Sequence, residues 1–342
     1  MKSEKIKEWY ITNKKLYFAS IELTQNCNFR CKHCYCANKE SQNLCFEDYI
    51  NIIDKLHSLG CLFLNFTGGE IFTYKYFKEV YSYAKDKGFI IDLLTNGSLI
   101  DLELINLFKK LPPNNIAITI YGTNEEDYLN FTGDKENYNK TITALKLLKK
   151  NNIHFVLRTV ATKTLKNSLM KHEFDKLAMS FDTTFKYDPI VFPKTTGDIS
   201  PLIESMEIHE IIELEKNTLV RKIAWEEAVK SNYEAEIFNW SCQAGVSSIA
   251  IDFQGDAFVC GLYRKNPISI LKNDISMVLK HLENIHNNHI NIVKNNECSV
   301  CNKRNICKWC PAYSFIYNNN DIEKIDFFCN LAEARVDEFG IK

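Results

Sequence analysis

The chain has 342 residues, of which 45% are hydrophobic and 25% are charged, a balance that excludes a disordered or fibrous protein. Lysine plus arginine number 42 and aspartate plus glutamate 43, so the net charge of −1 gives no overall positive field for nucleic acid. No apolar run approaches the roughly 20 residues of a membrane span, and the polar start MKSEKIKEWY lacks the apolar core of a signal peptide. We therefore expect a cytoplasmic protein with no membrane or nucleic-acid partner.

Strand-like and helix-like segments alternate along the first two thirds of the chain. In the segment 46–60, for example, Tyr49, Ile53 and Leu56 recur at helical spacing. Six strand–helix alternations predict an α/β fold with a parallel sheet and crossover helices. The predicted strands are 16–24, 61–67, 89–95, 115–122, 154–161 and 184–192, and the predicted helices are 46–60, 72–87, 99–110, 136–150 and 164–179.

The pattern changes in the last third of the chain. A loop at 194–201 and a charged helical stretch from about 205 to 230 lead to short strands, turns and cysteines after Trp240. The segment 247–260 predicts a hairpin that turns at Gln254-Gly255. The expected parts are an N-terminal extension over 1–15, a barrel-like domain over 16–235 and a small cysteine-rich α+β domain over 236–342.

The 13 cysteines are unusual for a chain without an export signal. Disulfides are rare in the cytosol, so clustered cysteines there indicate metal or redox chemistry. Cys27, Cys31 and Cys34 follow the first predicted strand, where sites form in parallel α/β folds. Three thiolates do not easily complete a tetrahedral site, but they can hold three irons of a [4Fe–4S] cube and leave the fourth open. A zinc knuckle and incidental cysteines are the alternatives.

The segment CNFRCKHC resembles the signature of the radical S-adenosylmethionine (SAM) enzymes. The resemblance covers roughly residues 17–200 and implies a partial (β/α)6 TIM-like barrel. It also implies that the open iron binds SAM, and that the reduced cluster cleaves SAM to a 5′-deoxyadenosyl radical that abstracts a substrate hydrogen. A flavodoxin or ferredoxin would supply the electron.

Other segments of the family pattern follow successive strands. The motif Thr67-Gly68-Gly69-Glu70 is similar to the family segment whose backbone and carboxylate meet the SAM amino group. By the same resemblance, His33 lies near the adenine and Asn96 lines the SAM site. Arg158, at a predicted strand end, is a candidate partner of the SAM carboxylate. Ordinary turns and a structural ion pair are the alternatives for these residues.

A second group of cysteines occupies the last third of the chain. Its seven thiolates exceed one zinc site and nearly fill two iron–sulfur cubes. The spacing resembles the SPASM extension, which carries two auxiliary [4Fe–4S] clusters and brings the expected total to three. By that resemblance the nearer cluster is held by Cys242, Cys260 and Cys310, and the outer one by Cys298, Cys301, Cys307 and Cys329.

The nearer set has only three cysteines. Some members of the family carry an eighth cysteine just before the first, and the segment YEAEIFNWSC has only Cys242. The nearer cluster is therefore expected either to keep an open iron or to take a non-cysteine ligand such as Glu236.

Auxiliary clusters can accept the electron that a substrate radical leaves behind, which favours a net oxidation. The segments 118–133 and 187–202 resemble those of members that crosslink ribosomally made precursor peptides through thioether, C–C or C–O bonds. Tyr121 and Asp188 are candidate catalytic or substrate-contacting residues, with core packing and a strand cap as their alternatives. The predicted barrel starts near residue 16, so a separate docking protein is an expected partner unless the barrel itself recognises the peptide.

Three other functions are weighed against this one. A sulfatase-maturing enzyme, which makes formylglycine, would carry an acidic residue where Gly261 follows Cys260. A haem-precursor decarboxylase would need cationic groups for propionates, and arginine is scarce. A non-enzymatic zinc or iron–sulfur scaffold leaves the motifs after three successive strands unexplained.

Overall fold

The computed structural model describes residues 2–36, 43–234 and 242–340. Within these residues the centre of the molecule is a nine-stranded sheet in the order β6-β5-β4-β3-β2-β1-β7-β8-β9. Strands β1 to β7 pair in parallel, while β8 and β9 extend the sheet in antiparallel fashion. The strands are β1 (Phe18–Thr24), β2 (Phe63–Gly68), β3 (Ile90–Thr95), β4 (Asn115–Thr119), β5 (Val156–Val160), β6 (Phe185–Asp188), β7 (Ser248–Ile251), β8 (Asp256–Phe258) and β9 (Ile268–Ser269).

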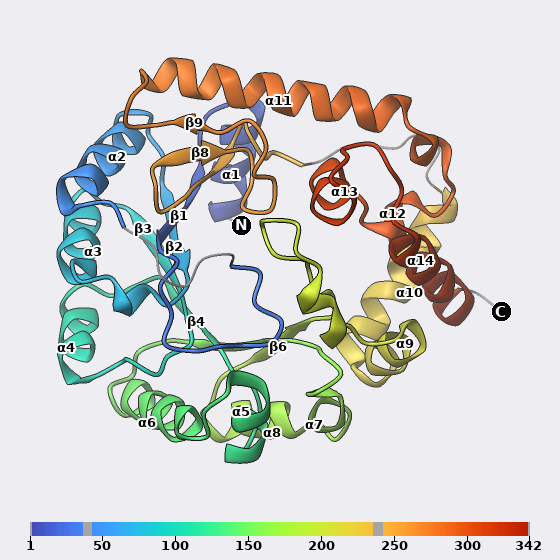
Figure 1. Cartoon of the computed structure of the whole chain (residues 1–342), viewed down its shortest axis with the longest axis horizontal. Coiled ribbons are helices and arrows are strands. Elements are labelled where there is room, and N and C mark those ends of the chain that lie inside the picture. The colour runs from blue at the N-terminus through green and yellow to red at the C-terminus, as the bar shows by residue number, and fades with distance from the viewer. Residues whose placement is uncertain (1, 37–42, 235–241, 341–342) are drawn as a thin grey trace.

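Helices surround the curved sheet, and α11 runs along one side from β9 to α13 (Figure 1). Short 3-10 turns are η1 (Ile71–Thr73), η2 (Ser200–Glu204) and η3 (Glu297–Val300). The helices are α1 (Lys2–Thr12), α2 (Phe46–Ser58), α3 (Phe77–Asp86), α4 (Leu102–Lys110), α5 (Glu125–Thr132), α6 (Glu136–Lys150), α7 (Lys166–Met170), α8 (Glu173–Ser180), α9 (Ile208–Asn217), α10 (Leu219–Glu234), α11 (Ile275–Asn295), α12 (Arg304–Cys307), α13 (Pro311–Asn318) and α14 (Asp326–Phe339).

The predicted fold class, a partial (β/α)6 barrel followed by a small cysteine-rich domain, is confirmed. All six predicted strands form within a few residues of their expected bounds, and the predicted helix 136–150 matches α6. The predicted helix 164–179 is instead two helices, α7 and α8. His172 between them adopts a left-handed backbone with φ of 54°, which a continuous helix does not allow.

The last third contains more helix than the sequence analysis expected. The predicted hairpin is present as β7 and β8, but α11, α13 and α14 lie where short strands and turns were expected. The periodic signal is nevertheless in the sequence, because Val278, Leu282 and Val293 of α11 are fully buried on one face. The expected boundary at 235/236 falls outside the described residues.

The two faces of the sheet differ in polarity. Alternate residues such as Ile21, Leu64 and Ile91 are fully buried in a core shared with the helices, and burial of each contributes about 1.5–3 kcal/mol. The opposite face carries polar side chains, and Asn65 Nδ2 donates to Ser20 Oγ at 3.2 Å across β1 and β2. The inside of the barrel therefore carries polar side chains beside apolar ones such as Leu94 and Val160.

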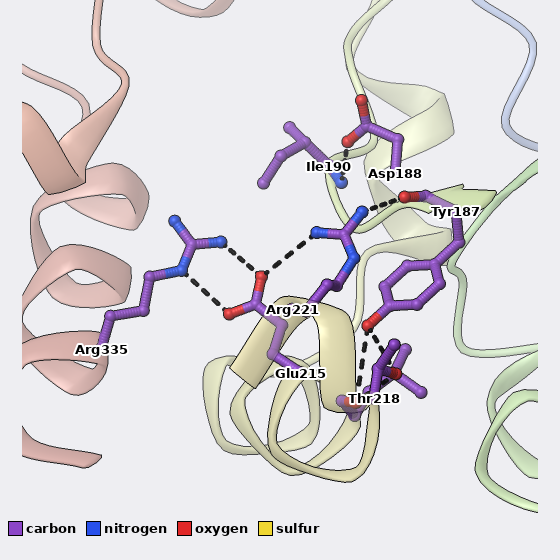
Figure 2. A network of polar contacts seen from close by, with 8 residues as sticks. Tyr187, Asp188, Ile190, Glu215, Thr218, Arg221 and Arg335 are labelled. Carbon is purple, nitrogen blue, oxygen red and sulfur yellow. Dashed lines mark hydrogen bonds and ion pairs between the residues drawn. The ribbon is translucent and has the colours of Figure 1, made fainter. Parts of the chain in front are cut away.

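A buried ion pair joins the C-terminal helix to the barrel (Figure 2). The carboxylate of Glu215 on α9 accepts two hydrogen bonds from Arg335 on α14, Nε to Oε2 at 3.0 Å and Nη2 to Oε1 at 2.7 Å. Arg221 on α10 lies 3.7 Å from Glu215 Oε1 and also donates to the carbonyl of Tyr187. The network fixes α14 against the end of β6, one residue before Asp188.

No helix in the described part of the chain combines the length and apolar character needed to cross a membrane.

Replacing Arg335 with Met is expected to lower the free energy of unfolding by about 3–5 kcal/mol, because it leaves the carboxylate of Glu215 without its bidentate partner. Lys216→Met is the matched control, since Lys216 pairs with Glu338 across the same two helices but is exposed. The control should cost less than about 1 kcal/mol. Urea unfolding followed by circular dichroism measures both, and equal losses would contradict the structural role given to Glu215.

Candidate active site

The three cysteines that follow β1 line a cavity at the carboxyl ends of the strands. Cys27, Cys31 and Cys34 lie in the loop between β1 and α2, together with His33. The cavity has a volume of about 210 Å³ and opens to solvent. The ends of β2, β3 and β4 supply Thr67, Gly68, Gly69, Leu94, Thr95, Asn96, Thr119 and Tyr121.

Two glycines at the end of β2 allow this loop to approach the sheet. Gly69 N donates to Thr24 O at 2.7 Å, and Glu70 N donates to Asn26 O at 2.8 Å. A Cβ on Gly69 would lie 2.3 Å from Asn26 O, and one on Gly68 would lie 2.0 Å from Thr24 O. Only glycine therefore fits between the two segments, and the backbone itself forms this wall of the cavity.

The carboxylate of Glu70 lies behind this wall and is fully buried. Its Oε1 accepts from Thr95 Oγ1 at 2.7 Å and from Phe72 N at 3.2 Å, while Oε2 accepts from Asn96 N at 2.7 Å. Burial raises the pKa of Glu70 to about 7, although these hydrogen bonds act to lower it. Glu70 is not among the residues that line the cavity, so its predicted contact with SAM stays a prediction, whereas its role in joining β2 to β3 is visible.

Aromatic rings form another wall of the cavity. The His33 ring lies 5.0 Å from that of Phe131 and 6.0 Å from that of Tyr121, measured between centroids. Tyr121 also stacks on Phe131 at 5.6 Å. Burial raises the pKa of Tyr121 well above its ordinary value, and the thiols of Cys31 and Cys27 raise it further. A flat aromatic base fits such a wall.

The other two residues predicted to bind SAM differ in position. Asn96 lines the cavity, where its Nδ2 donates to Asn28 Oδ1 at 3.0 Å and its Oδ1 accepts from Ser98 N at 2.9 Å. Arg158 is exposed on β5, two residues before Val160, and is not among the residues that line the cavity. The structure therefore brings Asn96 to the site and leaves Arg158 outside it.

A second cavity, with a volume of about 550 Å³, is lined in part by Cys242, Cys260 and Cys310. Burial raises the pKa of Cys310 to about 12, and the thiols of Cys260 and Cys242 raise it further. Burial also raises the pKa of Cys260, so the positive charge of a metal ion would favour the thiolates of these two buried cysteines. Asp188 lines the same cavity, and its Oδ1 accepts from Ile190 N at 2.9 Å (Figure 2).

The remaining four cysteines of the last third form a third group beside α12 and α14. Burial raises the pKa of Cys307 to about 11, with further increases from Cys329, Cys298 and Cys301. Arg304 lies close enough to these thiols to interact with them electrostatically. The assignment of these cysteines to two auxiliary clusters, which the family resemblance implies, stays a prediction.

Among the described residues, no three His, Cys, Asp or Glu side chains come close enough to share one metal ion. The thiolates of a [4Fe–4S] cube each bind a different iron, so they stand further apart than the ligands of one zinc ion. Glu236, the predicted non-cysteine ligand, lies outside the described residues.

Some residues of the site were missed in the sequence analysis. The two cavities share Tyr35, Val160, Ile190 and Phe192 in their linings, so they are neighbours rather than separate sites. Tyr35 and Val160 lie outside the segments that the resemblance singled out, whereas Ile190 and Phe192 lie within the segment 187–202. His289 and Lys308 also line the second cavity. Burial lowers the pKa of His289 to about 4, so its imidazole is neutral at pH 7.

We compared the chain with known protein families and with known proteins. Residues 21–174 match the model of the radical SAM superfamily. The chain is 23% identical to the AdoMet-dependent heme synthase of Methanosarcina barkeri, over 89% of this chain and 93% of that protein. It is 28% identical to the antilisterial bacteriocin subtilosin biosynthesis protein AlbA of Bacillus subtilis over 72% of this chain, and spans 55% of AlbA.

A solved structure shares the fold. Streptococcus suis SuiB bound to the precursor peptide SuiA matches with a TM-score of 0.73 at 15% identity, covering 96% of this chain and 79% of SuiB.

Gly69→Ala is expected to weaken SAM binding, because the new Cβ must displace the loop that carries the cysteines. Overpacking of this kind costs about 1–3 kcal/mol, which corresponds to roughly 5- to 150-fold in affinity. Anaerobic isothermal titration measures the change. Gly88→Ala is the control, since nothing lies within 4 Å of its added Cβ, and it should lower stability without changing SAM affinity. Equal SAM affinity in wild type and Gly69→Ala would contradict the close approach.

Glu70 makes stability depend on pH. Because its pKa is raised from 4.5 to about 7, the stability linked to Glu70 is full below pH 4.5 and is lost as pH rises through about 7. The shift corresponds to about 3 kcal/mol. Glu70→Gln should remove this decline and, because its amide opposes the Asn96 N–H, lower stability by about 1–3 kcal/mol at the acid end. Urea unfolding at several pH values tests this, and parallel curves for both proteins would refute it.

Proposed function

We propose that the protein is an enzyme that oxidatively crosslinks a ribosomally made peptide. Two observations support this function: residues 21–174 match the radical SAM domain, and the chain resembles the radical SAM peptide maturases. The coarser statement, a radical SAM enzyme with SAM and a SAM-binding [4Fe–4S] cluster, follows from the family. The finer statement, that the substrate is a peptide and the reaction a crosslink, rests on the residues that line the two cavities and on the residues that the cavities share.

The residues of the first cavity fit the cofactors. Cys27, Cys31 and Cys34 would hold the cluster, the backbone of Gly68 and Gly69 would face the SAM amino group, and His33 would contact the adenine. When bound, this group supplies the electron that cleaves SAM and so generates the radical that removes a substrate hydrogen. The chain's own residues orient SAM, and the aromatic wall excludes water from the reacting atoms.

The observation that carries the proposal is the lining shared by the two cavities. A substrate held by Tyr35, Ile190 and Phe192 is next to both the SAM site and the trio Cys242, Cys260 and Cys310. An electron left on the substrate therefore has an acceptor nearby if the last third holds two auxiliary [4Fe–4S] clusters. We assign those clusters to the cysteine sets given above. In this proposal Asp188, which lines the second cavity, takes the proton that the substrate loses.

The charge of the lining favours a peptide over a porphyrin. Among the described residues lining the two cavities, Lys308 is the only lysine or arginine. A haem precursor carries several carboxylates that need cationic partners, whereas a peptide side chain beside Val160, Ile190 and Phe192 needs none. A haem-precursor decarboxylase is the second candidate, because the likeness to the heme synthase extends over 93% of that protein.

Metal content and product analysis test the proposal. Anaerobically reconstituted protein should contain about 12 irons with equal sulfide, as three cubes require, and about 8 after Cys27, Cys31 and Cys34 are changed to Ala. That triple variant should form no 5′-deoxyadenosine from SAM and dithionite. About 4 irons with zinc would refute the auxiliary clusters.

Substrate class is tested by mass spectrometry with SAM, a reduced flavodoxin and one of two probes. A mixture of short bacterial precursor peptides should yield a product that has lost two hydrogens, and this loss should disappear in Asp188→Asn. Decarboxylation of iron coproporphyrin III, with no change in any peptide, would overturn the peptide proposal in favour of the second candidate.

A further inference from the structure

Helix α11 presents a buried histidine to the second cavity. His289 is 7% exposed and lines the same cavity as Cys242, Cys260 and Cys310. Its Nε2 atom is buried and has no hydrogen-bond partner among the described residues. A buried polar atom without a partner costs about 1–3 kcal/mol, so it needs a physical explanation.

The neighbouring histidines of α11 do not share this property. His286 Nδ1 lies 2.9 Å from Ala244 O, and His281 Nε2 lies 2.9 Å from Asn266 O. His289 instead packs against the edge of the Tyr263 ring, at 4.6 Å between centroids. The hydroxyl of Tyr263 donates to Asp321 Oδ2 at 3.0 Å, and Asp321 interacts electrostatically with His289.

The cysteines of this cavity leave one position of a four-iron group without a thiolate. We propose that Nε2 of His289 is the fourth protein ligand of the [4Fe–4S] group held by Cys242, Cys260 and Cys310. The inference rests on the auxiliary cluster of the proposed function. A neutral imidazole is an established iron ligand, and among the described residues no hydrogen bond occupies the Nε2 lone pair of His289.

Asp188 is the competing described ligand in this cavity. Its side chain is exposed and its Oδ1 already accepts from Ile190 N, so water and the backbone satisfy it. His289 has neither. With all four irons bound to protein, this cluster serves as an electron acceptor and does not bind substrate. Replacing a thiolate with imidazole also raises the reduction potential, as in the Rieske clusters.

Pulsed EPR tests the ligand directly. Full-length protein is labelled with ¹⁵N-histidine, reconstituted anaerobically and reduced with dithionite in the absence of SAM. A strongly coupled nitrogen that changes with the label is expected in wild type. It should persist in His281→Ala, the control on the same helix, and disappear in His289→Ala.

The variant His289→Cys controls for the case in which His289→Ala loses the signal only because it misfolds or fails to bind iron. This variant restores four thiolates, so it should keep about 12 irons, lose the nitrogen coupling and lower the midpoint potential of the nearer cluster. About 12 irons in wild type without a coupled histidine nitrogen, or a coupling that persists in His289→Ala, would overturn the assignment. About 4 irons in wild type would instead refute the auxiliary clusters of the proposed function, and this assignment with them.

Discussion

The buried carboxylate of Glu70 is the interaction on which the site depends. It accepts from Phe72, Thr95 and Asn96, so one side chain fixes the loops that follow two adjacent strands. The glycines just before it let the cysteine loop lie directly on that assembly. Three thiols, an aromatic wall and a backbone wall then face one cavity, because they are held to a common rigid base rather than to independent loops.

Much of the barrel could be predicted because its signals are local. Strand-like segments that alternate with helically periodic segments predict all six strands. Because the strands are parallel, their carboxyl ends lie at one edge of the sheet. The break at His172 could not be foreseen, since a left-handed residue inside an apolar pattern leaves no periodic trace. The long helix α11 was not predicted, although its apolar residues recur at helical spacing.

The site was predictable where spacing encodes chemistry and not where packing decides it. Cys260 and Cys310 are distant in the sequence but line one cavity, whereas Cys307, close to Cys310 in the sequence, interacts with Cys298 and Cys329. Arg158 and Val160 lie on the same face of β5, but only Val160 lines the cavity. The cavity lies at the carboxyl ends of the strands, and Arg158 is two residues further from that end. Tyr35 and His289 belong to no segment that the resemblance singled out, and only the folded arrangement of distant segments brings them together with Ile190.

The parallel pairing of β7 with β1 has a consequence for how the molecule is organised as a unit. The register from Phe18–Ser248 to Ile21–Ile251 makes the cysteine-rich part a continuation of the barrel sheet. Without β7, the backbone of β1 would be an open edge, the kind of surface that recruits strands from other chains. The two parts are therefore not interchangeable modules. A shift of β7 along β1 would move Cys260, which follows β8, relative to the cysteines that follow β1.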